Sequence, residues 1–98
     1  MAQSCVYRVP GGRLELDLQS DIVAISTRVV APLAPASDAF GASTHLEPIF
    51  EIGGERLALH AGEMAAVPAR LVSGTPVADL RDEDYAIYRS LNMLFWDF

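Results

Sequence analysis

Hydrophobic and polar residues alternate in short stretches over the first two thirds of the chain. The clearest stretch is residues 14–19, where leucine occupies every second position. A period of two predicts a β-strand with the leucines on a buried face and the intervening acids in water. Residues 4–9 are also rich in strand-forming types, and Pro10-Gly11-Gly12 predicts a turn that joins the two strands as a hairpin.

Further strands are predicted where β-rich stretches lie between turns, at residues 27–33, 48–52, 55–59 and 69–73. Gly53-Gly54, between two of them, is a strong signal for a two-residue hairpin. Pro32 marks an edge, a bulge or the end of its strand, because proline cannot donate to a strand ladder. Residues 35–44 are rich in Ala, Ser, Gly and Pro and predict a surface loop.

The period changes to that of a helix near residue 80. A buried stripe at helical spacing is formed by Leu80, Ile87, Leu91 and Leu94. Asp79 is the expected N-cap, and the acidic run 82–84 suits the positive end of the helix dipole. The expected fold class is therefore mainly β (α+β), an antiparallel sheet or open barrel that carries one C-terminal α-helix.

The only tryptophan lies on the other side of this helix. At about 100° per residue, Trp96 falls with Tyr85, Arg89 and Asn92, opposite the buried stripe. Asp97 and the chain-terminal carboxylate lie at the negative end of the dipole, where each is unfavourable by about 0.3–1 kcal/mol. An outward tryptophan beside an arginine is typical of a binding hot spot. The alternative is that Trp96 covers a second patch of its own subunit, or that the last turn frays.

Charge limits the classes of partner. The 98 residues carry 13 acidic and 7 basic side chains, a formal charge of −6, and none is lysine. Binding to nucleic acids and to anionic membranes depends on cationic side chains, so both are disfavoured. Hydrophobic residues make up 51 % of the chain, a high share for a small domain, and we expect some of them to pack against a second copy.

Candidate chemistry is sparse. Cys5 is the only cysteine, which suits a reducing compartment, and no signal peptide or apolar span of about 20 residues is visible, so cytoplasm is expected. His45 and His60 lack metal-ligand spacing, and no nucleotide-binding or nucleophile motif occurs. We expect no catalytic residue, no metal and no cofactor, and take the acidic run 82–84 as a solvated first turn. A protein-binding module is favoured over an enzyme.

Several segments, in order along nearly the whole chain, resemble the CcdB family of bacterial toxins. The matching segments are Leu91-Asn92-Met93-Leu94-Phe95-Trp96 at the helix end, residues 16–22 as the second strand and the loop after it, residues 30–34 as the next strand, residues 64–68 as a later turn and residues 77–80 as the entry to the helix. Each match is weak alone, but the set is specific.

The resemblance implies one toxin domain over residues 1–98, an SH3-like antiparallel barrel with a C-terminal helix, and a homodimer. It implies the toxin of a type II toxin–antitoxin system, of the kind linked to plasmid maintenance, that is neutralised by a cognate CcdA-like antitoxin. The target it implies is the A subunit of DNA gyrase, trapped on cleaved DNA without chemistry by the toxin. The gyrase-binding positions carried over are Ser20, Ile22, Asn92, Phe95, Trp96, Asp97 and Phe98, with the tryptophan stacked on a gyrase arginine.

One departure from the family keeps alternatives open. The best-known members end in Trp-Gly-Ile, whereas this chain ends in Trp96-Asp97-Phe98. Asp97 adds a charge and removes the backbone freedom of glycine, and it is the only support for a non-toxic homologue that binds antitoxin alone. A MazF-type endoribonuclease toxin shares the fold, but the lack of lysine and the net negative charge argue against it.

Overall fold

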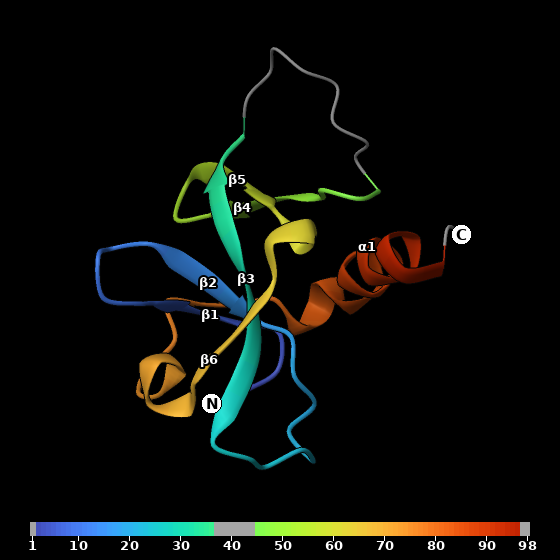
Figure 1. Cartoon of the computed structure of the whole chain (residues 1–98). Helices are drawn as coiled ribbons and strands as arrows, with labels where there is room; N and C mark the ends of the chain where they lie inside the picture. Colours follow the sequence, from blue (N-terminus) through green and yellow to red (C-terminus); the bar gives the residue numbers. More distant parts are fainter. Residues whose placement is uncertain (1, 37–44, 97–98) are drawn as a thin grey trace.

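The sheet is built around one long strand. A computed structural model describes residues 2–36 and 45–96. The strands in these residues are β1 Cys5–Arg8, β2 Leu14–Asp17, β3 Thr27–Pro35, β4 Ile49–Ile52, β5 Glu55–Leu59, β6 Ala65–Pro68 and β7 Ala78–Asp79. They pair antiparallel in the order β4-β5-β3-β2-β1-β7, and β6 also pairs with β3. One end of β3 pairs with β6 and the other with β5, so the sheet bends into a nearly closed barrel (Figure 1).

Helical segments connect and flank this sheet. Short 3-10 helices occupy Ala61–Glu63, Ala69–Val72 and Arg81–Glu83, and α1 spans Asp84–Trp96. The mainly β fold with a C-terminal helix is thereby confirmed. None of the helices in the described part of the chain combines the length and the apolar character that crossing a membrane requires.

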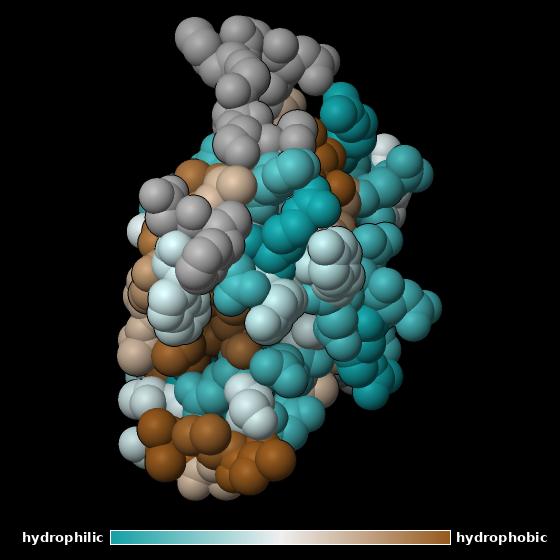
Figure 2. All heavy atoms as spheres, turned by 90° about the vertical axis from the view of Figure 1, so that its right-hand side faces the viewer, coloured by the Kyte–Doolittle hydropathy of each residue, from teal (hydrophilic) through white to brown (hydrophobic). Residues whose placement is uncertain are grey.

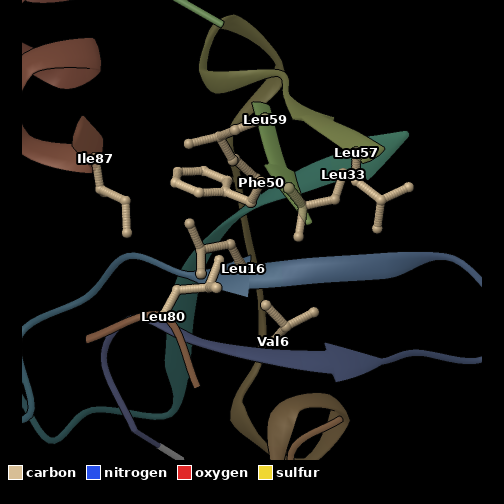
Figure 3. Packing of buried hydrophobic residues seen from close by; sticks show 9 residues of the cluster. Val6, Leu16, Leu33, Phe50, Leu57, Leu59, Leu80 and Ile87 are labelled. Carbon is tan, nitrogen blue, oxygen red and sulfur yellow. The ribbon is translucent and has the colours of Figure 1, made fainter. Parts of the chain in front are cut away.

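The main core lies on the leucine face of β2. It consists of Val6, Leu16, Ala31, Leu33, Phe50, Leu57, Leu59, Leu80 and Ile87. Figure 3 shows these side chains converging from the strands and from the start of α1. Leu14 and Leu18 pack against the same cluster, so the predicted leucine face is confirmed.

The acids of β2 are buried, which contradicts the prediction that they face water. Glu15 is 4 % exposed and Asp17 is 0 % exposed. The reason is a second core on the other face of the sheet, formed by Cys5, Tyr7, Val9, Val30 and Val72. Alternation fixes which residues share a face, and here segments after β6 cover that face as well.

Both predicted hairpins are confirmed. Gly53 and Gly54 join β4 to β5 with φ angles of 61° and 83°, the left-handed conformation that a two-residue hairpin turn requires. β1 and β2 pair around the turn of residues 10–12. Pro32 does not end its strand, because β3 continues to Pro35. Its carbonyl oxygen accepts a hydrogen bond from His60 N, 2.9 Å away, between the stretches of β3 that pair with β6 and with β5.

The strand predicted at residues 69–73 is wrong. Those residues form a 3-10 helix, Ala69–Val72, of which only Val72 is buried. The strand lies one segment earlier, as β6, where the family resemblance had placed a turn. Pro68 ends it, and Ala69 N then donates to Ser26 O at 2.9 Å. The last strand is the two-residue β7, which pairs with β1.

We expect Glu15→Met to stabilise the protein at pH 8. Glu15 Oε2 is buried without a hydrogen-bond partner, and burial raises the pKa of this carboxyl although Arg13 opposes the shift. Between the ordinary and the raised pKa the folded protein binds more protons than the unfolded chain, so stability falls as pH rises through that window. Removing the acid should add about 1 kcal/mol to the free energy of unfolding at pH 8.

The gain should shrink at pH 4, where most of the Glu15 carboxyl is protonated in both states. Thermal unfolding at the two pH values measures it. Glu55→Met, at an exposed acid of β5, is the matched control and should change little. A gain that is as large at pH 4 as at pH 8 would contradict the assignment of the cost to the buried charge.

Candidate functional site

The end of α1 projects beyond the sheet. Ile87 and Ser90 are its buried residues, and Ser90 Oγ donates to the carbonyl oxygen of Leu46. Leu94 was predicted to be buried but is 36 % exposed, because the helix leaves the sheet before its last turn (Figure 1). Trp96 is 61 % exposed, which confirms the outward position and contradicts the alternative that it covers its own subunit.

Aromatic side chains are exposed along this helix. Phe95 is 58 % exposed and packs against Trp96 in a T-shaped contact, with ring centroids 5.7 Å apart and an interplanar angle of 64°. Nearer the start of the helix, the Arg89 guanidinium lies 5.6 Å from the centroid of the exposed Tyr85 ring. Trp96 and Phe95 therefore form a compact aromatic tip at the end of α1. Tryptophan in particular is enriched among the residues that contribute most to binding at protein interfaces.

The start of the helical segment differs slightly from the prediction. The predicted N-cap is wrong, because Asp79 ends β7 and Leu80 is the N-cap of the 3-10 helix that precedes α1. The Asp79 carboxylate still accepts a hydrogen bond from Arg81 N at 3.0 Å. The Arg81 guanidinium also bonds this carboxylate and lowers its pKa to about 2. Ser4 Oγ donates to Asp84 Oδ1 at 2.8 Å, which ties the start of α1 to the N-terminal segment. These contacts favour a structural role for the acids of this region.

A second exposed apolar surface lies on the loop between β2 and β3. Ile22 is 92 % exposed, Ile25 60 % and Val23 45 %. Figure 2 shows strongly hydrophobic atoms at the foot of the molecule, where Figure 1 places this loop. Sequence reasoning named Ile22 but missed Val23 and Ile25. Their only signal in the sequence is that apolar residues occur in a stretch without strand or helix periodicity.

Ser20 shapes the turn that carries Ile22. Its carbonyl oxygen accepts from Val23 N at 3.0 Å, and its Oγ accepts from Ile22 N at 3.3 Å. Serine is favoured at the first position of such turns. Ser20 is half-buried. Because of its two hydrogen bonds, this predicted contact residue also has a structural role in the loop.

Arg28 anchors the same loop from inside the protein. Its guanidinium contacts the fully buried Asp17, with Nη2 2.8 Å from Oδ2, and the exposed Asp21, with Nη2 3.1 Å from Oδ1. The backbone N–H of Gln3 donates to Asp21 at 2.9 Å. These hydrogen bonds, that of Gln3 first, hold the pKa of the Asp21 carboxyl below its usual value.

The described residues of the predicted site fall into two separate groups on the surface of this chain. Ser20 and Ile22 lie in the loop at the foot of the molecule, whereas Asn92, Phe95 and Trp96 lie on the projecting part of α1 at its right-hand side (Figure 1). A groove between α1 and the end of β2 is lined by Gln3, Ser4, Leu18, Asp84, Ile87, Tyr88 and Leu91. Asp97 and Phe98, also predicted for the site, lie outside the described residues.

Few groups are arranged for chemistry. The described residues contain no group of three or more His, Cys, Asp or Glu side chains that could hold a metal ion. His60 Nδ1 lies 2.8 Å from Glu47 Oε2 and 3.6 Å from Glu63 Oε2, so the imidazole ring lies between two carboxylates. Cys5 is 3 % exposed, and its pKa is raised, chiefly by burial, which makes the thiol a poor nucleophile.

Comparison with known proteins gives one family. The family model described as CcdB protein matches residues 3–97 of the 98-residue chain. A comparison with curated proteins returns no match. The matched residues include both groups of predicted site residues that the structure describes, in the loop after β2 and at the end of α1.

Trp96→Ala should leave the fold intact. Because most of the side chain is exposed, we expect the free energy of unfolding to change by less than about 1 kcal/mol. Ile87→Ala, on the buried face of the same helix, should instead cost about 2–5 kcal/mol. Chemical denaturation of the two variants measures both values, and an unfolded Trp96→Ala protein would contradict an outward tryptophan.

Proposed function

The chain belongs to the CcdB family, whose members are toxins of toxin–antitoxin systems, and we propose that it acts by binding the A subunit of DNA gyrase and trapping the cleaved-DNA complex. The observation that carries this proposal is the exposed aromatic tip of α1. Trp96 belongs to neither hydrophobic core, and its exposed ring supplies a flat face that attracts a cationic arginine side chain.

The gyrase-binding surface proposed here consists of Ser20, Ile22, Asn92, Phe95, Trp96, Asp97 and Phe98. The loop group and the helix group are apart in one subunit, and we propose a homodimer as the binding unit. The 51 % hydrophobic content, which is high for a domain of this size, favours such a dimer. A cognate CcdA-like antitoxin is the second proposed partner, and the cytoplasm, where gyrase acts, is the proposed location.

The proposed action needs no catalytic group in the toxin. A trapped complex requires only that the toxin binds one state of gyrase better than the others, which shifts the population toward that state. The chain supplies exposed apolar side chains for such binding on both groups of residues.

An endoribonuclease of the MazF type is the alternative. Such an enzyme needs cationic side chains for the phosphates of its substrate. Among the seven basic residues, Arg28 is buried in an ion pair with Asp17, and Arg81 is held by Asp79. These contacts reduce the positive charge available for RNA, so the gyrase proposal is favoured.

The purified protein should increase gyrase-mediated cleavage of supercoiled DNA and leave a test RNA intact. Trp96→Ala should reduce cleavage at least about tenfold, in line with a lost interface hot spot of about 2 kcal/mol. Tyr88→Ala, which removes another exposed aromatic side chain of α1 outside the proposed site, is the matched control and should retain cleavage. Quantified linear DNA measures the effect.

Other outcomes separate the alternatives. Cleavage of RNA without any effect on gyrase would overturn the proposal and favour the endoribonuclease. Binding of an antitoxin without an effect on gyrase or RNA would favour the non-toxic homologue, and restored poisoning in Asp97→Gly would then assign the defect to that residue.

A further inference from the structure

Ile22 is unusual because a fully exposed aliphatic side chain is carried by a tightly bonded loop. Its side chain is 92 % exposed, so packing does not hold it. The residues on either side of it are both fixed by hydrogen bonds. Asp21 is bonded to Arg28 and to the backbone of Gln3, and the carbonyl oxygen of Val23 accepts from Gln19 Nε2 at 2.7 Å.

Gln19 acts as a strut across the inside of the loop. Its side-chain Nε2 also donates to Thr27 O at 3.1 Å, and its Oε1 accepts from Val29 N at 3.0 Å. Gln19 is only 9 % exposed, so these bonds form away from water. The amide therefore joins the middle of the loop to the start of β3.

Arg28 fixes the strut to the sheet. Its Nη2 donates to the carbonyl oxygen of Gln19 at 2.9 Å, while its Nε lies 3.0 Å from Asp17 Oδ2. Arg28 is 3 % exposed and Asp17 is 0 % exposed. A buried ion pair of this kind leaves little freedom, because separation of the two charges exposes each to an apolar interior.

We propose that Gln19, Asp21 and Arg28 are positioning residues that hold the backbone on both sides of Ile22. They keep the loop in the conformation that binds gyrase before the two proteins come into contact. This inference rests on the proposed function, since it concerns the loop assigned to gyrase binding. Holding the loop in this way should strengthen binding. If the loop loosens, only a fraction of the molecules has the conformation that binds, and the apparent dissociation constant rises by the inverse of that fraction.

Asp21→Asn is the decisive variant. It keeps the shape and the acceptor for Gln3 N but removes the charge that pairs with Arg28. We expect binding of the purified gyrase A subunit to weaken about tenfold, the loss that follows when the competent loop falls to about a tenth of the population. Hydrogen exchange at the amides of Ile22 and Val23 should accelerate in the same variant.

Asp79→Asn is the matched control. Asp79, like Asp21, accepts one backbone N–H and one arginine, but it lies at β7, away from the loop. The two variants should lower the thermal midpoint by similar small amounts, whereas only Asp21→Asn should weaken gyrase binding. Gln19→Met, which removes the strut, should weaken binding in the same direction.

A double-mutant cycle with Ile22→Ala tests whether Asp21 acts through Ile22. In the Ile22→Ala background, Asp21→Asn should have no further effect on binding. A full effect in that background would overturn the positioning role, because Asp21 would then contact gyrase itself. Binding by Asp21→Asn equal to that of Asp79→Asn would overturn it too, with the proposed function intact. No binding by the wild-type chain would overturn the proposed function and the positioning role together.

Discussion

The buried ion pair between Arg28 and Asp17 is the contact on which both the second core and the loop after β2 depend. Asp17 lies on a sheet face that is covered on its far side, so its carboxylate needs an internal partner. Arg28 provides that partner from β3 and at the same time bonds Gln19 O and Asp21. One guanidinium thus satisfies a buried charge and determines the path of the loop after β2.

Local patterns predicted the elements of this fold well. The alternation at residues 14–19, the Gly53-Gly54 turn and the outward Trp96 all follow from periods and dihedral preferences within a few residues, and all are confirmed. The prediction that the acids of β2 face water was wrong, because periodicity says which residues share a face but not what covers that face. The Asp17–Arg28 pair joins residues 11 apart, and only the register of β2 on β3 brings them together.

The positions of the candidate site residues in the fold were predictable to a similar extent. Helical spacing placed Trp96 correctly but gave Leu94 to the core, since nothing in the sequence tells where the helix leaves the sheet. Val23 and Ile25 escaped notice because loops have no period against which an exposed apolar residue stands out. The separation of the loop from the end of α1 is a property of the assembled sheet, and sequence order contains no measure of it.

Pro32 also limits the registers in which β5 and β6 can pair with β3. Within an extended strand the amide and carbonyl of one residue point to the same side, so the missing N–H of Pro32 lies beside its carbonyl, where the partner of β3 changes from β6 to β5. If β5 or β6 paired with β3 in a shifted register that reached Pro32, its carbonyl groups would find no backbone N–H donor at that residue. Pro32 therefore separates the pairing sites of β5 and β6 along the one long strand that they share, and it disfavours misaligned registers of either.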